Sequence, residues 1–302
     1  MELDPSTSGD EIHAERNCKG TAMTNTSPIW FITGASSGLG RALAEAVLER
    51  GWRVAITARK PETLNSIVSI HGERALALEL DVTSKTSVAA AVAAAETHFG
   101  AIDVLVNNAG YGYLAAIEEG VDSEIRAQFE TNVFGLIEVT QQVLPGMRAR
   151  RRGHVFNMSS LGGLVAFAAT GYYHGTKFAV EGLSESLFHE VDPLGIKVTI
   201  VEPGAFRTNW AGSSMIESQT VIDDYAETAG KRREATRSVS GNQPGDPKRA
   251  AAAIIKAYEA ETPPLRLLLG APALKMARQR LEDLRSNFDA WAEVTLSADF
   301  PG

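Results

Sequence analysis

Residues 29–51 read IWFITGASSGLGRALAEAVLERG, and this stretch decides the fold. It opens with a short apolar run, which is typical of a buried strand. A turn with glycine at positions 34, 38 and 40 follows, and apolar residues then recur at helical spacing from position 39 to 48. Gly51 is a natural C-terminal stop for that helix. The stretch therefore predicts a strand, a tight turn and a helix, which is the first unit of a parallel α/β sheet.

The same alternation continues along the chain. Apolar runs predict strands at residues 29–33, 53–58, 75–80, 102–106, 154–158, 197–201 and 265–269. Helical patterns cover residues 39–50, a segment from Pro61, 84–99, 123–147, 172–191, 248–260 and 272–291. Strands that are apolar on both faces and separated by helices belong to a parallel sheet covered on both sides. We therefore expect an α/β, Rossmann-type, doubly wound parallel sheet in a single domain over residues 28–302.

Two segments lack this regularity. Residues 1–27 are polar and have no apolar core of signal-peptide type, so we expect a disordered N-terminal extension. Residues 210–247 are rich in Ser, Gly and charge, and they are too long for a plain connection in a compact domain. We expect residues 210–247 to form a substrate lid.

Composition excludes several classes of protein. The net charge is −8, which disfavours non-specific binding to nucleic acid or to an anionic membrane. A single cysteine excludes an intramolecular disulfide, and no Cys/His cluster has zinc spacing, so no metal is expected. Residues 155–176 carry no charge, but their glycines and polar groups favour a buried strand and loop over a membrane span. A cytoplasmic protein is expected.

The glycine-rich turn has the spacing G-x-x-x-G-x-G. Glycine allows a tight turn and the close approach of a pyrophosphate to backbone N–H groups, and the helix that follows presents an anion site. Alone, such a turn can be a structural corner, but its strand–turn–helix context favours a dinucleotide. The residues expected at the phosphates are Gly34, Ser36, Ser37, Gly38, Leu39 and Gly40.

The end of the second predicted strand bears on the choice of cofactor. NAD-binding sites usually carry an acid there, which holds the ribose 2′-hydroxyl, whereas this chain has Ala58 followed by Arg59 and Lys60. Arg59 can hold a 2′-phosphate in a bidentate way. The alternative is that Arg59 and Lys60 are solvated surface charges. We expect NADP (NADPH) as the cofactor.

Further motifs follow in order along the chain. They are Asp81-Val82, Asn107-Asn108-Ala109-Gly110, Asn132, Ser159-Ser160, Tyr173 with Lys177, Pro203-Gly204 and Thr208. Together with the glycine turn, they resemble the short-chain dehydrogenase/reductase family from about residue 28 to residue 208. The Gly-Tyr-Gly-Tyr run at 110–113 and the C-terminal segment weakly resemble the branch that includes 17β-hydroxysteroid dehydrogenase-like enzymes.

The resemblance implies roles for these residues. Asp81 and Val82 are similar to the family's contacts with adenine. Asn108, Ala109 and Gly110 resemble the segment along the cofactor, and Pro203, Gly204 and Thr208 resemble the contacts at the nicotinamide. The catalytic set that it implies is Asn132, Ser160, Tyr173 and Lys177. In that set Lys177 also holds the nicotinamide ribose, and Asn132 supports a water-linked proton path.

The spacing of Tyr173 and Lys177 supports this chemistry. Residues four apart share one face of a helix, and a nearby cation lowers the pKa of a tyrosine, which makes it a better acid–base group. Tyr172 lies on another part of the helix surface. Ser160 has the family's spacing to Tyr173, whereas Ser159 can be only a turn residue. No metal or triad spacing involves His154, His174 or His189, so we expect these histidines to be surface or packed residues.

The expected function is NADP-dependent hydride transfer between nicotinamide and a carbonyl or alcohol, with an apolar small-molecule substrate. The alternatives are an NADP-binding regulatory protein without turnover and, less favoured, an isomerase or epimerase. Aromatic residues at 111, 113, 206 and 210 either line the substrate pocket or pack within loops. The helices around residues 131–144 and 172–188 resemble those that pair subunits in the family, so a homo-oligomer, dimer or tetramer, is expected.

Overall fold

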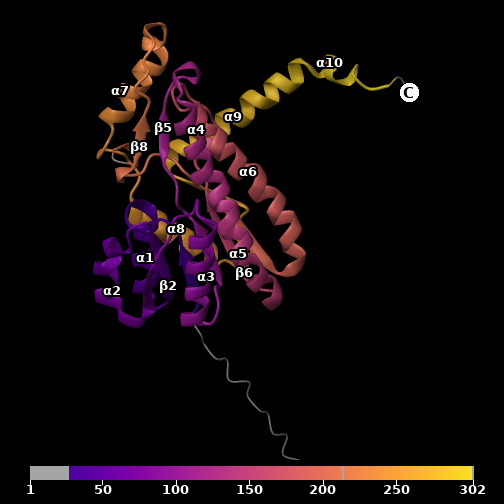
Figure 1. Ribbon diagram of the computed structural model, residues 1–302. Coiled ribbons are helices and arrows are strands. Elements are labelled where there is room, and N and C mark those ends of the chain that lie inside the picture. The colour runs from indigo at the N-terminus through magenta and orange to yellow at the C-terminus, as the bar shows by residue number, and fades with distance from the viewer. Residues whose placement is uncertain (1–26, 213, 301–302) are drawn as a thin grey trace, which may run out of the picture.

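The computed structural model describes residues 27–212 and 214–300. Its centre is a seven-stranded sheet in the order β3-β2-β1-β4-β6-β7-β9, and every neighbouring pair is parallel (Figure 1). The strands are β1 (Ile29–Ile32), β2 (Arg53–Ala58), β3 (Ala75–Glu79), β4 (Val104–Asn107), β6 (Gly153–Met158), β7 (Ile196–Pro203) and β9 (Arg266–Leu269). The predicted doubly wound parallel sheet is confirmed. The predicted extension at residues 1–27 lies, except for Ser27, outside the described residues.

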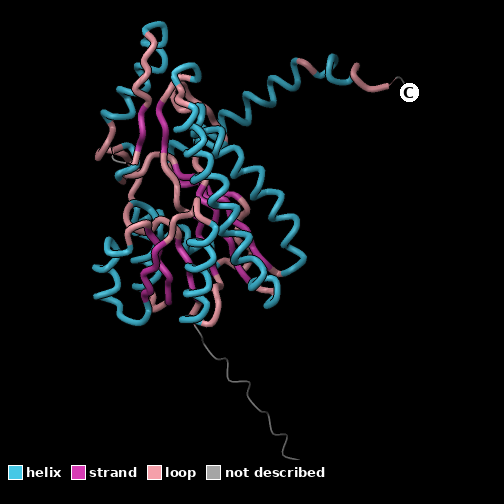
Figure 2. Tube along the Cα trace, in the orientation of Figure 1, coloured by secondary structure: helices cyan, strands magenta, loops and turns pink. Residues whose placement is uncertain are grey.

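Helices cover both faces of this sheet (Figure 2). One face packs against α1 (Gly38–Glu49), α2 (Asn65–His71) and α8 (Pro247–Glu259). The other packs mainly against α3 (Lys85–Phe99) and α5 (Gly135–Arg150), with the end of α6 (Gly171–Val191) beside them. Alternation along β1 sends Trp30 and Ile32 into the first core and Phe31 into the second, and all three are fully buried.

The helix predicted at residues 84–99 illustrates why the local sequence decides these elements. The structure begins α3 at Lys85, and the hydroxyl of Ser84 accepts a hydrogen bond from Ser87 N, as a helix N-cap does. The helix ends at Gly100, whose φ of +89° is in the left-handed region.

The region predicted as one helix over residues 123–147 differs from that prediction. It is α4 (Asp122–Phe129), a π-helical turn over Glu130–Phe134, and α5. A π turn widens the backbone by one residue and often marks a functional site. Here it contains Asn132.

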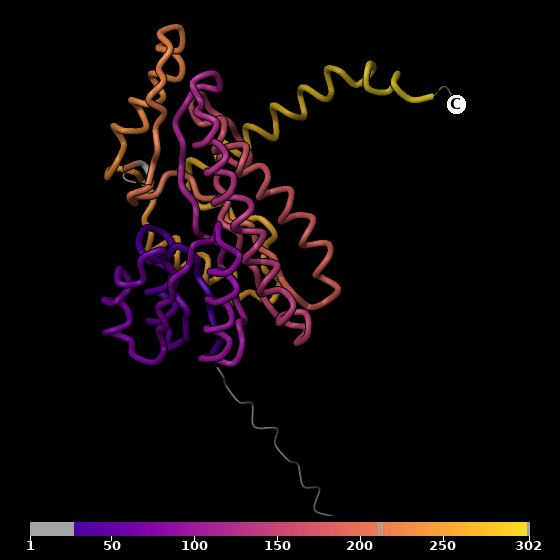
Figure 3. Tube along the Cα trace, viewed as in Figure 1, coloured from indigo at the N-terminus to yellow at the C-terminus, as the bar shows by residue number. Residues whose placement is uncertain are grey.

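The segment 210–247, which showed no periodicity, contains regular elements. Its β8 (Met215–Glu217) pairs in parallel with β5 (Gly112–Leu114), and it also holds α7 (Lys231–Ser238). In Figure 3 this orange segment lies beside the part of the chain that follows β4. Figure 2 shows that the β5–β8 pair is separate from the main sheet. Strands of three residues are too short to leave a pattern in the sequence.

A buried ion pair docks this segment on the body of the protein. Arg233 of α7 lies 2.5 Å from the carboxylate of Glu119, and the two side chains are 6% and 2% exposed. The same carboxylate accepts hydrogen bonds from the backbone N–H groups of Ala116 (2.8 Å) and Ile222 (2.9 Å).

The C-terminal helices leave the body of the molecule. The N-terminal half of α9 (Ala271–Ala290) packs through Ala273 and Ala277, whereas its second half and α10 (Ala292–Leu296) extend outward (Figure 1). Among the helices of the described residues, none combines the length and the apolar character that crossing a bilayer requires.

Candidate active site

A large cavity opens at the carboxyl ends of the parallel strands. Its volume is about 1280 Å³, and it is bounded by the turns after β1, β2, β3, β4, β6 and β7, by α6 and by the segment after β7. Open parallel sheets bind ligands at this edge. Of the site residues predicted from the sequence, the cavity wall contains Gly34, Ser36, Ser37, Gly38, Leu39, Arg59, Asp81, Val82, Asn108, Ala109, Gly110, Ser160, Tyr173, Lys177, Pro203, Gly204 and Thr208. Gly40 and Asn132 are not part of the wall.

The glycine turn after β1 is built for close backbone approach. Gly34 has φ +65°, and a Cβ there would lie 2.9 Å from the Cα of Ala109. A Cβ on Gly40 would overlap the side-chain amide of Asn108 and lie 2.8 Å from the carbonyl oxygen of Gly34. Gly40 therefore serves the packing of the turn, while Gly34 lies in the cavity wall.

The start of α1 is open to an anion. The helix begins at Gly38, and the side chain of its N-cap residue Ser37 makes no capping hydrogen bond. The first backbone N–H groups of a helix have no partner within the helix, so they attract a phosphate. Asn108 fixes this turn, because its Nδ2 donates to the carbonyl oxygens of Thr33 (2.9 Å) and Gly34 (3.0 Å).

Arg59 lies at the end of β2 in the same cavity. Its side chain is exposed, and no carboxylate of the described residues lies within ion-pair distance of it. Asp81, across the cavity wall after β3, accepts hydrogen bonds from the backbone N–H (3.0 Å) and the hydroxyl (2.7 Å) of Thr83.

Tyr173 and Lys177 are buried on one face of α6. Their residues are 6% and 7% exposed, and the Nζ of Lys177 lies 5.6 Å from the centroid of the Tyr173 ring. Nζ donates a hydrogen bond of 2.7 Å to the carbonyl oxygen of Met158 at the end of β6. Burial raises the pKa of Tyr173 to about 12, and a hydrogen bond from the Ser160 hydroxyl opposes that shift. The direction is opposite to the lowering expected from the charge of Lys177, because burial outweighs it. Burial lowers the pKa of Lys177 to about 8, against the attraction of the Glu181 carboxylate.

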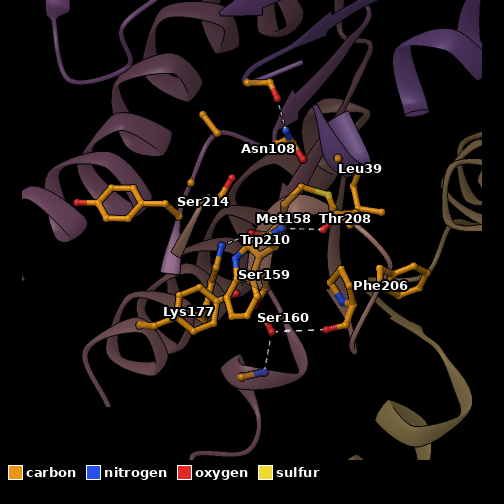
Figure 4. A pocket seen from close by; sticks show the side chains of 18 of the residues that line it. Leu39, Asn108, Met158, Ser159, Ser160, Lys177, Phe206, Thr208, Trp210 and Ser214 are labelled. Atoms are coloured by element: carbon orange, nitrogen blue, oxygen red, sulfur yellow. Dashed lines mark hydrogen bonds between the residues drawn. The ribbon is translucent and has the colours of Figure 1, made fainter. Parts of the chain in front are cut away.

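The two neighbouring serines have different partners. The Oγ of Ser160 accepts from Gly162 N at 2.9 Å and reaches the carbonyl oxygen of Pro203 at 3.5 Å. The Oγ of Ser159 instead donates to the carboxylate of Glu181. Figure 4 draws the two hydrogen bonds of Ser160 as dashed lines.

Behind these serines lies a buried charge cluster that was not predicted from the sequence. Arg266 of β9 pairs with the carboxylates of Glu181 and Glu202, and the Arg266–Glu202 distance is 2.9 Å. Burial raises the pKa of Glu202 to about 7, with the nearby Glu181 carboxylate acting in the same direction. The one signal in the sequence was the position of Glu181, four residues after Lys177 on the same helix.

Asn132 lies inside the protein and does not face solvent. Its Oδ1 accepts from Tyr111 N at 3.0 Å, and its Nδ2 donates to Tyr111 O at 2.9 Å and to Thr176 Oγ1 at 3.2 Å. A Cβ placed on Gly110 would lie 3.0 Å from the Oδ1 of Asn132 and 3.9 Å from the Nζ of Lys177. Gly110 therefore lies between the side chains of Asn132 and Lys177, and the π turn is the element that carries Asn132 to this position.

Aromatic residues also line the cavity. Trp210, Phe206 and Tyr111 lie in the cavity wall. Tyr113 does not: it is fully buried, and its hydroxyl accepts a hydrogen bond from Val121 N. Tyr113 therefore belongs to loop packing. Tyr172 also lies outside the cavity wall, with its hydroxyl donating to Ile117 O at 2.5 Å.

The three histidines considered in the sequence analysis, His154, His174 and His189, lie in packed or exposed positions. His174 is buried and makes hydrogen bonds with Gly162 O, Thr170 Oγ1 and Phe167 N. His154 is buried beside Phe156, and burial lowers its pKa to about 3. His189 is exposed. In residues 27–212 and 214–300, no group of three His, Cys, Asp or Glu side chains could hold a metal ion.

Comparison with known proteins agrees with this geometry. A family profile described as short chain dehydrogenase matches residues 28–218. The chain is 43% identical to oxidoreductase BOA17 of Botryotinia fuckeliana over 89% of this chain and 98% of that one. It is 38% identical to a 3-ketodihydrosphingosine reductase of Bacteroides thetaiotaomicron, over 80% and 87% of the two chains.

Solved structures show the same similarity. A short-chain dehydrogenase from Streptomyces avermitilis superposes with a TM-score of 0.86 at 44% identity, covering 92% of this chain and all of that chain. Two members of the fold from Burkholderia, each 25% identical to this chain, were solved with nucleotides. The B. phymatum protein holds NAD (TM-score 0.74; 86% and 95% of the chains) and the B. cenocepacia protein holds NADP (TM-score 0.68; 87% and 97%).

Proposed function

Because the chain belongs to the short-chain dehydrogenase/reductase family, we propose that it transfers a hydride between NADP and a carbonyl or alcohol substrate. An oxidoreductase role is common to its relatives. The observation that carries the proposal is that Tyr173, Lys177 and Ser160 lie in the wall of the cavity that also contains the glycine turn and Arg59.

The residues present fit a dinucleotide. The turn at Gly34 and the open N-terminus of α1 would receive the pyrophosphate. Asp81 and Val82 would border the adenine, and Pro203, Gly204 and Thr208 would border the nicotinamide. The cavity runs without interruption between these residues, and its volume of about 1280 Å³ is large enough for a nucleotide together with a substrate.

Arg59 supports NADP over NAD. At the end of β2, where an acid would repel a 2′-phosphate, the chain has Ala58 and then an arginine without a carboxylate partner among the described residues. A guanidinium offers paired N–H groups to a phosphate, which an ammonium group does not. Relatives of this fold hold either nucleotide, so the choice rests on Arg59 itself.

The proton chemistry is assigned to three side chains. When bound, the nicotinamide supplies or accepts the hydride. In reduction, the phenol of Tyr173 gives its proton to the substrate oxygen; in oxidation, the phenolate takes that proton back. Lys177, whose Nζ lies 5.6 Å from the ring, stabilises the phenolate by its charge. The hydroxyl of Ser160 orients the substrate oxygen, and Asn132 and the backbone around Tyr111 support the path by which Lys177 is resupplied with a proton.

The walls of the cavity suit a substrate with a largely apolar body. Trp210 and Phe206 come from the segment after β7, and the segment 210–247 would act as a lid over that substrate. A homo-oligomer is also proposed, because the π turn before α5 leaves Phe134 exposed and α6 leaves Phe178 and Leu183 exposed, at 41% to 54%.

One experiment distinguishes the proposed oxidoreductase from the alternative, a sensor that binds NADP without turnover. The purified protein is titrated with NADPH and with NADH, and nicotinamide absorbance is then followed with a panel of aldehydes and ketones. The proposal predicts tighter binding of NADPH and carbonyl-dependent oxidation of it. Tight binding with no turnover across the panel would favour the sensor, and absence of binding would contradict both.

A further inference from the structure

Arg232 places a cation in the wall of the substrate side of the cavity. It lies on α7, lines the same cavity as Tyr173 and Ser160, and its Cζ lies 4.7 Å from the centroid of the Phe167 ring, over its face. A guanidinium that lies over an aromatic face keeps its in-plane N–H groups free for a further partner.

The neighbouring basic residues on α7 are all paired, and Arg232 is not. Lys231 pairs with Glu227, Arg233 with Glu119, and Arg237 with Glu217. In the part of the chain that the structure describes, no carboxylate lies within 4.0 Å of the Arg232 guanidinium, and its side chain makes no hydrogen bond. The helix thus directs one cation to the cavity, while Arg233 and Arg237 attach the helix to Glu119 and Glu217.

The contacts of Arg232 lead to the residue next to Tyr173. Phe167, on which it lies, donates its backbone N–H to His174 Nε2 at 3.0 Å, and His174 is next to Tyr173 in α6. Burial lowers the pKa of His174, and the positive charge of Arg232 lowers that pKa further. The surroundings of Arg232 also lower the pKa of its guanidinium by desolvation, although the side chain remains exposed. A partly desolvated cation without a counter-charge is stabilised when an anion binds to it.

We propose that Arg232 binds a carboxylate carried by the substrate. The inference rests on the proposed function, because it concerns the same cavity, and it names the substrate class: a carbonyl or hydroxy compound whose apolar body ends in a carboxylate. The apolar body lies against Phe167 and Trp210, and the carboxylate takes two N–H groups of the guanidinium, whose planar fork matches its geometry.

A binding experiment tests Arg232 without requiring turnover. The NADP-saturated protein is titrated calorimetrically with straight-chain monocarboxylates of increasing length and with the matching primary amides. We expect the carboxylates to bind at least about tenfold more tightly than the amides, with an optimum chain length. Arg232→Gln should remove this preference, and Arg232→Lys should keep part of it. Lys231→Gln, which removes the same charge one residue away, should leave the preference intact.

Equal binding of acids and amides by the wild-type protein, or a preference that survives Arg232→Gln, would overturn the inference. So would binding of alkyl phosphates with exclusion of carboxylates.

A second readout separates the failure of this inference from the failure of the proposed function. Oxo acids and their methyl esters are compared as substrates of the wild-type protein and of Arg232→Gln. We expect kcat/KM for the acids to fall at least about tenfold in the variant, mainly through KM, with the esters within about twofold. Turnover of esters and acids at equal rates would overturn the role of Arg232 and leave the oxidoreductase standing. Carboxylate binding that depends on Arg232, without hydride transfer to any oxo acid, would support this site and contradict the proposed reaction.

Discussion

The indole ring of Trp210 lies against the phenol ring of Tyr173, with centroids 5.1 Å apart and planes inclined by 59°. Trp210 belongs to the segment after β7, and Tyr173 belongs to α6, so this contact joins the proposed lid to the proposed acid–base group. Both side chains line the same cavity, so Trp210 borders the space next to Tyr173.

Trp210→Ala should weaken substrate binding more than cofactor binding. Removal of the indole takes away an apolar wall, and we expect KM for apolar ketones to rise about tenfold, with the Kd of NADPH unchanged within about twofold. Steady-state kinetics and a fluorescence titration measure the two quantities. Trp291→Ala is the matched control, because Trp291 is 60% exposed near the C-terminus. Equal effects of the two variants would remove Trp210 from the substrate site.

Arg59→Ala should change the choice of nucleotide. Loss of the charge-assisted hydrogen bonds to a 2′-phosphate is expected to raise the Kd of NADPH about 30-fold, while the Kd of NADH changes less than about twofold. Lys60→Ala, at the next exposed position, serves as the control. If NADPH and NADH were weakened equally by Arg59→Ala, the argument for NADP would be lost.

Two glycine substitutions should have opposite effects on stability. Gly40→Ala places a methyl group against Asn108 and 2.8 Å from the carbonyl oxygen of Gly34, so we expect unfolding free energy to fall by about 2 kcal/mol. Gly182→Ala, within α6, meets no atom within 4 Å and should raise it by about 0.5–1 kcal/mol, because alanine favours the helix. Urea unfolding measures both. A neutral Gly40→Ala would show that the turn can rearrange.

His154 should make the protein less stable in acid. Its pKa in the folded protein is about 3, below the ordinary value of 6.5, so the unfolded chain takes up a proton that the folded chain refuses. The folded protein therefore has its full stability above pH 6.5. As the pH falls from 6.5 to 5, the free energy of unfolding decreases by about 2 kcal/mol. His154→Gln should remove that part of the pH dependence. His98→Gln, at an exposed position, should keep it. An unchanged slope in His154→Gln would contradict the buried neutral state.

The fold could be predicted because each main strand is a continuous apolar run and each crossover is a separate helical pattern. Residues 29–51 show this, and so does the helix predicted over residues 84–99, which the structure gives as α3 with Ser84 as its N-cap. Predictions failed where elements are short: β5 and β8 have three residues each, and their stability comes from pairing with each other and not from a local pattern.

The candidate site could be predicted to the same extent, and for the same reason. Residues at the strand ends, such as Asp81 and Ser160, are brought to one cavity by the parallel sheet itself. The pairing of Arg266 with Glu181 and Glu202 joins three distant parts of the chain, so no spacing in the sequence reveals it. The position of Arg232 depends likewise on how the segment 210–247 docks through Arg233.

The most direct test of the account is a single-turnover measurement of NADPH oxidation by Tyr173→Phe and Tyr172→Phe with a carbonyl substrate that the wild-type protein reduces. The account predicts that Tyr173→Phe binds NADPH within about twofold of wild type and loses roughly 1,000-fold or more in rate, because the proton donor is gone. Tyr172→Phe should keep its rate, since its hydroxyl only donates to Ile117 O. A Tyr173→Phe variant that still reduces the substrate at the wild-type rate would contradict the central claim.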